Sequence, residues 1–185
     1  MRRAMMVAVL GLGLAAGAMG LAWAANVPAA NPAALAGLDA RAAVQLANEW
    51  AARGEKVQSF ITTQALHFQW PDGRQAVVNL DPGEVYVAIA PYVRRTHPCQ
   101  VHYLSSCRGE LPGRRFAVEV TTLDGKPVYQ GEVVTLFNGF FELWLPRGLD
   151  LVIRVQGRDG LSGEATGIIS TRPDAPTCIT TLRLS

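Results

Sequence analysis

The chain has 185 residues, of which 49% are apolar and 17% are charged, and its formal net charge at pH 7 is +2. This length and composition are typical of one or two small domains with a hydrophobic core and argue against disorder. Two of the 17 basic residues, Arg2 and Arg3, lie in an expected export signal; without them the basic and the 15 acidic residues balance. A neutral chain cannot neutralise many phosphates, so we expect no nucleic-acid partner.

The first 24 residues have the pattern of a secretory signal peptide. Met1–Arg3 is basic, residues 4–21 are uncharged and apolar, and Ala22-Trp23-Ala24 is a small-x-small cleavage pattern. A retained membrane anchor is the alternative, because the run approaches the length of a bilayer span. Its Gly and Ala content and its small-residue end favour cleavage after Ala24 or Ala25. No cysteine stands at the cleavage point, so we expect neither a lipid anchor nor a stable membrane anchor.

Residues 25–37 are rich in Ala, Pro and Asn and are expected to form a flexible lead-in. An N-terminal region over residues 38–83 should follow, beginning with a helix. Asp39 is a plausible N-cap, Gly54 would end the helix, and one apolar stripe runs along it at Ala43, Leu46, Ala47 and Trp50. This stripe must pack against the following sheet or against a second copy of the chain.

The pattern then alternates with a period of two. Residues 65–70 and 75–80 flank Pro71-Asp72-Gly73-Arg74, which predicts a β-hairpin. Residues 84–90 predict the next strand. Pro91 and Pro98 keep the segment after it out of regular sheet, because neither can donate a ladder hydrogen bond.

Residues 84–185 are expected to form a mainly β domain, an antiparallel sandwich or a barrel-like fold. Short alternating strands separated by turns are typical of both architectures. Asn138-Gly139 is a strong two-residue hairpin signal that would pair the strands on its two sides. The expected strands cover residues 116–121, 128–137, 140–145, 149–155, 163–170 and 178–184. The aromatic residues on this hairpin, Phe137, Phe140, Phe141 and Trp144, are interpreted as core.

Two of the three histidines and two of the three cysteines lie within one short stretch: His97, Cys99, His102 and Cys107. Thiolate sulfur and imidazole nitrogen are the donors that soft and borderline metals prefer. The remaining cysteine, Cys178, lies near the far end of the chain. If the fold returns Cys178 to this stretch, three sulfurs would suit Cu(I), and zinc would accept the same donors with a fourth ligand.

The alternative is a structural disulfide between two of the three cysteines, with the third buried. Exported proteins usually oxidise neighbouring cysteines, and oxidation of Cys99 with Cys107 would abolish the metal site. The spacing of Cys99 and Cys107 matches neither a C-x-x-C redox motif nor a zinc finger. With three cysteines, one disulfide leaves one thiol unpaired. A disulfide also does not explain the two neighbouring histidines, which favours the metal site.

Other candidate residues carry less weight. His67 lies mid-hairpin and is interpreted as a surface or half-buried sheet residue. The carboxylates stand apart in expected turns or on strand faces, so no two of them form a pair suited to acid-base catalysis: Asp81, Glu84, Asp124 and Glu142. The chain contains no G-x-S-x-G, glycine-rich phosphate loop or H-E-x-x-H motif.

Several motifs resemble the CueP family of periplasmic copper-binding proteins, and the resemblance extends from about Leu38 onward. The motifs are Ala90-Pro91-Tyr92-Val93, Thr96-His97-Pro98-Cys99, His102, Leu104-Ser105-Ser106-Cys107-Arg108-Gly109-Glu110-Leu111, Asn138-Gly139-Phe140, Trp144-Leu145-Pro146 and Thr177-Cys178-Ile179-Thr180-Thr181-Leu182. The resemblance implies that Cys99, Cys107 and Cys178 bind copper, with His97 and His102 as the motif histidines. It further implies a copper-resistance metallochaperone that supplies a copper-zinc superoxide dismutase, a homodimer formed by the N-terminal region, and a C-terminal β domain that holds the metal.

Three hypotheses therefore follow. The first is a periplasmic carrier that binds Cu(I) through three thiolates, with His97 or His102 as an auxiliary ligand or as the group that receives Cu(II). The second is a thiol-based Cu(II) reductase or thiol-disulfide redox protein. The third is an exported β-sandwich binding module with one structural disulfide.

Overall fold

The computed structural model describes residues 27–185, so the expected signal peptide lies outside the described residues. Between Val27 and Ser185 there is no helix with the length and hydropathy of a membrane span. The N-terminal elements are η1 (Pro32–Leu35), α1 (Ala40–Ala52), β1 (Gln58–Ile61), β2 (Ala65–Gln69) and β3 (Gln75–Asn79). The remaining strands are β4 (Glu84–Ile89), β5 (Arg115–Thr122), β6 (Pro127–Val134), β7 (Phe141–Pro146), β8 (Asp150–Gly157), β9 (Glu164–Ser170) and β10 (Cys178–Ile179).

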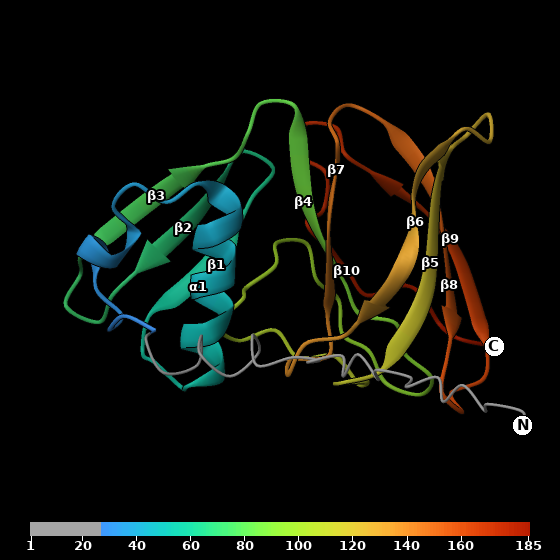
Figure 1. The fold of residues 1–185 in the computed structure, drawn as a ribbon, viewed down its shortest axis with the longest axis horizontal. Coiled ribbons are helices and arrows are strands. Elements are labelled where there is room, and N and C mark those ends of the chain that lie inside the picture. The colour runs from blue at the N-terminus through green and yellow to red at the C-terminus, as the bar shows by residue number, and fades with distance from the viewer. Residues whose placement is uncertain (1–26) are drawn as a thin grey trace, which may run out of the picture.

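The N-terminal layer is helix α1 on the antiparallel sheet β1-β2-β3 (Figure 1). The Asp39 side chain accepts a hydrogen bond from the Ala42 N–H, so it is the predicted N-cap. The predicted hairpin is also present, with Ala65 opposite Asn79 and Gln69 opposite Gln75. Trp50 is fully buried and packs edge-on against Phe68. The apolar stripe of the helix is therefore covered by the sheet of its own chain.

The expected flexible lead-in carries more structure than the sequence analysis predicts. Asn31 caps the short helix η1 through a hydrogen bond from the Ala34 N–H. The Pro28 and Ala30 carbonyls accept hydrogen bonds from the indole N–H groups of Trp50 and Trp70, both at 2.8 Å. Buried indole N–H groups need acceptors, and this segment supplies them.

The rest of the chain forms a β-sandwich of two sheets, β10-β4-β7 and β6-β5-β8-β9. Figure 1 shows the first sheet in the middle of the molecule, between the N-terminal layer and the four-stranded sheet. The mainly β fold is confirmed. Between Val27 and Ser185 the strands form open sheets and no closed barrel, so the sandwich rather than the barrel is the correct alternative.

The central sheet is buried on both faces. Alternate residues of β4 and β7 belong to two different cores, as a period of two requires. The face toward the four-stranded sheet carries Val85, Val87, Ile89, Phe141, Leu143 and Leu145. The opposite face, toward helix α1 and β1, carries Tyr86, Ala88 and Trp144 together with Cys178 of β10.

Two strand predictions need correction. Asn138-Gly139 does form a tight turn, but β6 before it and β7 after it belong to different sheets, so no hairpin forms. The turn is held instead by Gly109, whose N–H donates to the Asn138 carbonyl at 2.6 Å. A Cβ atom on Gly139 would lie 2.6 Å from the Gly109 carbonyl oxygen, so only glycine fits. The expected strand 178–184 is shorter, Cys178–Ile179, and is parallel to β4.

Candidate metal centre

The segment between β4 and β5 places both histidines and two cysteines beside the N-terminal layer. The Ile61 N–H at the end of β1 donates to the His102 carbonyl at 2.9 Å. The Ser59 N–H donates to the Ser105 hydroxyl at 3.2 Å. The segment therefore continues the edge of β1 and has a fixed position, although it contains no regular element.

Strand β10 brings the third cysteine to the same place. The Ala88 N–H of β4 donates to the Thr177 carbonyl at 2.9 Å, which aligns Cys178 with Ala88. The buried Thr177 hydroxyl donates to the Ile61 carbonyl at 2.6 Å and accepts from the His102 N–H at 3.1 Å. Thr177 thus joins β1, the His102 segment and β10 at one point.

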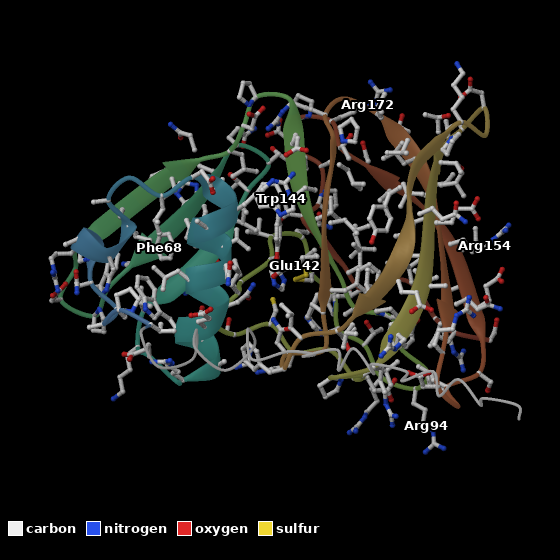
Figure 2. All side chains as sticks on the ribbon, in the orientation of Figure 1. Phe68, Arg94, Glu142, Trp144, Arg154 and Arg172 are labelled. Carbon is white, nitrogen blue, oxygen red and sulfur yellow. A yellow bond between two sulfur atoms is a disulfide. The ribbon has the colours of Figure 1, made fainter. Side chains whose placement is uncertain are left out.

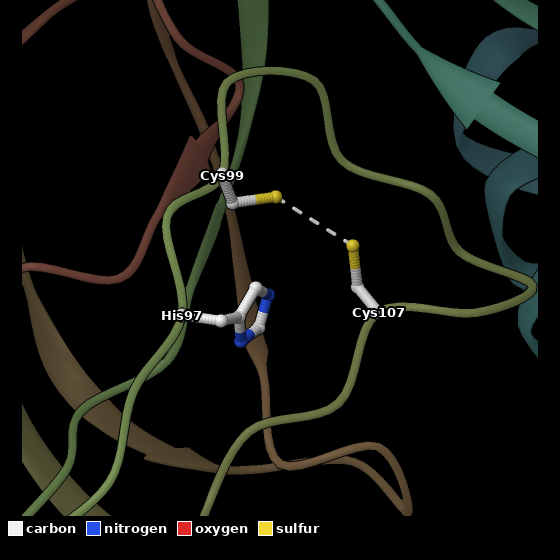
Figure 3. A group of neighbouring side chains, drawn as sticks. All are labelled: His97, Cys99 and Cys107. Carbon is white, nitrogen blue, oxygen red and sulfur yellow. Dashed lines mark hydrogen bonds between the residues drawn. The ribbon is translucent and has the colours of Figure 1, made fainter.

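The three sulfur atoms meet there. Cys99 and Cys178 form a disulfide across a sequence separation of 79 residues, and their Cα atoms are 5.5 Å apart. The Cys107 thiol lies 3.6 Å from the Cys99 Sγ (Figure 3). Two of the three cysteines are therefore paired, as in the disulfide alternative, and Cys107 rather than Cys178 is the thiol left over. Strand β10 places Cys178 against Cys99, whereas the Cys107 Sγ accepts a hydrogen bond from the Tyr103 N–H at 3.4 Å.

The donor atoms form two overlapping groups that share Cys107. His97, Cys99 and Cys107 form the first group, and all three are half-buried. His102, Cys107 and Cys178 form the second, in which His102 and Cys178 are buried. The donor atoms within each group lie within 4.8 Å of one another. All five predicted site residues are therefore brought together, and their role as ligands stays a prediction.

His102 is the buried histidine of the centre. It is fully shielded from solvent and packs on Phe140 at a ring distance of 4.5 Å. Burial, and secondarily the charge of His97, lower the pKa of His102 to about 3, so its imidazole is neutral at neutral pH. Its Nδ1 lies 3.7 Å from the Cys178 Sγ, and its Nε2 has no hydrogen-bond partner among residues 27–185.

These observations fit a soft metal ion. A buried polar atom without a partner costs about 1–3 kcal/mol, so it is uncommon outside functional sites. A neutral imidazole beside sulfur offers a lone pair, which copper and zinc both accept. Burial raises the pKa of the Cys107 thiol, and the Tyr103 N–H and the Arg108 charge act in the opposite direction. A metal bound there would have to displace the thiol proton.

Sequence reasoning missed a polar cluster next to the centre. The half-buried Glu142 of β7 accepts hydrogen bonds from the Tyr86 hydroxyl and the Asn48 amide, both at 2.6 Å. Figure 2 shows Glu142 and Trp144 between helix α1 and the central sheet. Burial raises the pKa of Glu142, and burial together with the Glu142 charge raises that of Tyr86. The sequence signal that could have revealed this cluster is a charged residue, Glu142, between apolar residues of an expected strand.

The other candidates lie where most of the sequence interpretations place them. His67 is half-buried, stacks on Phe60 at 4.7 Å and belongs to neither donor group. Phe140 and Phe141 are core residues, as interpreted, whereas Trp144 is half-buried and packs against the edge of the core. Phe137 departs from this interpretation, because 43% of its surface is exposed.

The fold and its donors define a β-sandwich protein with a candidate site for a thiophilic metal. The family model of the periplasmic copper-binding protein CueP matches residues 43–183. The chain belongs to the CueP family of periplasmic copper-binding proteins. It is similar to the structure titled "Crystal Structure of S.CueP", with 32% sequence identity and a TM-score of 0.74 over 83% of this chain and 92% of that one. None of the curated proteins matches the chain.

Proposed function

We propose that the protein sequesters copper as Cu(I) in the periplasm and delivers it to a client such as a copper-zinc superoxide dismutase, contributing to copper resistance. The observation that carries this proposal is the meeting of Cys99, Cys107 and Cys178 with His97 and His102 at one partly buried point. Three thiolates favour a soft monovalent ion, and zinc can substitute. The unpaired Nε2 of His102 supports an auxiliary role for this ring.

Loading requires the Cys99–Cys178 disulfide to be reduced. A dithiol reductant supplies two electrons and two protons, is itself oxidised to a disulfide, and leaves two thiols on the protein. Cu(I) then binds the sulfurs and displaces their protons. The oxidised protein keeps Cys107 as its one thiol, so it should hold copper far less tightly.

The test is Cu(I) binding in competition with a chromophoric Cu(I) chelator. We expect the reduced protein to bind Cu(I) tightly. The oxidised protein and a Cys178→Ser variant should bind it more than about 100-fold less tightly, because removing a ligand costs more affinity than removing a residue that only orients a ligand. His67→Ala is the matched control, because this histidine lies outside the donor groups. Unchanged tight binding by the Cys178→Ser variant would contradict the three-thiolate site.

A second candidate function is supported by the disulfide itself. Reduced Cys99 and Cys178 could give two electrons to two Cu(II) ions, forming two Cu(I) ions and the observed disulfide and releasing two protons. Thiol counting separates the two functions. A reductase loses two thiols as Cu(II) is added, whereas a carrier keeps its thiols through repeated loading with Cu(I).

We also propose the division that the family resemblance implies, with residues 38–83 as a dimer-forming region and 84–185 as the metal-binding β domain. The packing of β1 against the His102 segment supports a metal site that both parts stabilise. Sedimentation velocity of the mature protein tests the dimer. A monomer at all concentrations would contradict it.

A further inference from the structure

A surface hollow of about 370 Å³ lies beside the metal centre. It is lined by Arg95, Thr96, His97, Arg108, Gly109, Glu110 and Pro112. His97 belongs both to this lining and to the half-buried donor group with Cys99 and Cys107. A molecule in the hollow would therefore stand next to the more accessible side of the centre.

Two arginines, Arg95 and Arg108, line this hollow, and two more lie close to them in the structure. Arg94, Arg95 and Arg108 are exposed, and Figure 2 shows Arg94 pointing outward. Arg183 lies beside them, because its Nε donates to the Val93 carbonyl at 3.3 Å. We call Arg94, Arg95, Arg108 and Arg183 the arginine rim.

Little negative charge compensates the arginine rim. Glu110 is the one carboxylate that lines the hollow, and its Oε2 accepts hydrogen bonds from the Val93 and Arg94 N–H groups at 2.6 and 2.9 Å. These hydrogen bonds and the charge of Arg95 lower its pKa, so it is a carboxylate at neutral pH. The Glu110 carboxylate is therefore engaged by backbone N–H groups, and its single negative charge offsets only part of the positive charge of the arginine rim.

The arginine rim differs from the basic residues elsewhere in the described structure. Many of those are ion-paired with carboxylates: Arg41, Arg74, Arg115, Lys126, Arg154, Arg158 and Arg172. Within residues 27–185, no member of the rim forms such a pair. Like charges that gather without partners repel one another, so this surface is suited to a negatively charged ligand.

Phe137 indicates that the ligand is a protein. It is exposed on the turn that Gly109 holds, and the Arg108 guanidinium lies over its ring at 5.4 Å. Arginine and aromatic side chains are enriched in protein interfaces and dominate their binding energy. A small anion would be bound by the guanidinium groups alone and would not need to contact the exposed Phe137 ring.

We propose that the arginine rim and Phe137 form a docking surface for an acidic face of a protein partner that exchanges copper through His97. This inference rests on the proposed carrier function and names the chemistry of the partner. Complementary charge acts mainly on the rate of encounter, and its effect falls as salt screens it.

The test uses the mature protein and two fluorescent peptides. Both contain Leu-Ser-Gly-Ser-Leu, flanked by four aspartates in one and by four lysines in the other, so neither needs copper to bind. Fluorescence anisotropy at low salt should show at least tenfold tighter binding of the aspartate peptide. In an Arg94→Glu/Arg95→Glu variant this preference should be lost. These two side chains make no hydrogen bond or ion pair within the described residues, so the variant should keep its fold.

The matched control is Arg154→Glu/Arg158→Glu, which changes the same charge on the outer face of the four-stranded sheet and should keep the preference. Phe137→Ala should weaken binding of the aspartate peptide severalfold. Equal binding of both peptides, or a preference that survives Arg94→Glu/Arg95→Glu, would overturn the docking surface. Full displacement by citrate with no effect of Phe137→Ala would identify a small-anion site instead.

Copper transfer to peptides with Cys-Gly-Gly-Cys in place of Ser-Gly-Ser separates the two proposals. Failure to transfer copper to either peptide counts against the carrier function, while the anisotropy result still decides the docking surface. Transfer at equal rates to both peptides leaves the carrier function intact and contradicts the docking surface.

Discussion

The two faces of the central sheet differ in chemistry although the same strands form both. The face toward the four-stranded sheet is purely apolar and includes Val87 and Leu143. The opposite face carries Tyr86, Glu142 and Cys178 and leads to the metal centre. One strand thus contributes to a hydrophobic core and to a polar site at alternate residues.

This difference separates stability from function. Apolar burial stabilises the sandwich without any need for specific hydrogen bonds. The other face leads to a disulfide, an unpaired thiol and the buried His102, whose Nε2 has no hydrogen-bond partner among the described residues and therefore costs stability in the folded protein. Local features that lower stability are expected at functional sites and must be offset elsewhere. Here the offset comes from the opposite face of the same sheet.

Phe140 and Phe141 give the sharpest test of this comparison, because they are neighbours in sequence and lie in the two different cores. Phe141→Ala should lower the free energy of unfolding by about 3–5 kcal/mol, the usual cost of a cavity in a core. It should leave the Cu(I) affinity of the folded protein unchanged. Urea unfolding and chelator competition measure the two effects.

Phe140→Ala is the matched variant on the other face and should cost a similar free energy of unfolding. Phe140 packs on His102 at 4.5 Å and on His97 at 6.4 Å, so its loss releases both rings. We expect Cu(I) affinity to fall by about 10–100-fold, as for other residues that support a ligand. Equal affinities in the two variants would contradict the division of labour between the faces.

The buried carboxyl of Glu142 should have a smaller effect on the free energy of unfolding, and this effect should depend on pH. Burial raises its pKa, so the folded protein keeps the Glu142 proton at pH values where the unfolded chain has lost it. The contribution of this group to stability is therefore complete at acidic pH and is lost as pH rises above 4.5, the usual value. The slope is at most about 1.4 kcal/mol per pH unit for one proton.

Glu142→Gln should remove this slope, because the amide cannot titrate and its oxygen can still accept from Tyr86 and Asn48. Urea unfolding between pH 4.5 and 8 compares the variant with the wild type. Glu84→Gln is the matched control on β4, where the carboxylate pairs with Arg41 at a more exposed position. An identical slope in wild type and Glu142→Gln would show that the site-facing side tolerates the buried charge.

Sequence patterns predicted the parts of this molecule that depend on near neighbours. The helix from Asp39 and the hairpin around Gly73 follow from periodicity and turn chemistry, which act over a few residues. The donor types of His97 and Cys99 likewise indicated a thiophilic metal before the fold was known. These are properties of a residue and its surroundings in the chain.

The remaining features depend on contacts that no local pattern encodes. Cys99 pairs with Cys178 across 79 residues because β10 lies alongside β4, and the spacing of the cysteines in the sequence did not indicate which two would pair. The Asn138-Gly139 sequence is typical of a hairpin, but the turn contacts Gly109, and the strand after it joins a different sheet from the strand before it. Glu142 looked isolated because its partner Asn48 is 94 residues away.

Thr180 and Thr181 provide the mildest test, since only the first supports the metal centre. The Thr180 hydroxyl donates to the His97 carbonyl at 2.7 Å, and the Thr96 hydroxyl donates to the Thr180 carbonyl at 2.6 Å. Thr180→Val should cost about 0.5–1.5 kcal/mol for the lost hydrogen bond and should weaken Cu(I) binding by loosening His97. The exposed Thr181→Val should change stability by less than about 0.5 kcal/mol.

Chelator competition and thermal unfolding of both threonine variants would show whether the segment that follows β10 only stabilises the fold or also positions His97. A Thr180→Val protein with wild-type Cu(I) affinity but reduced stability would place this hydrogen bond among the structural contacts. A loss of affinity that exceeds the loss of stability would instead show that the segment after β10 positions His97 for copper binding. Because His97 also lines the hollow beside the arginine rim, the second outcome would show that the C-terminal segment supports the surface at which we propose that copper is exchanged.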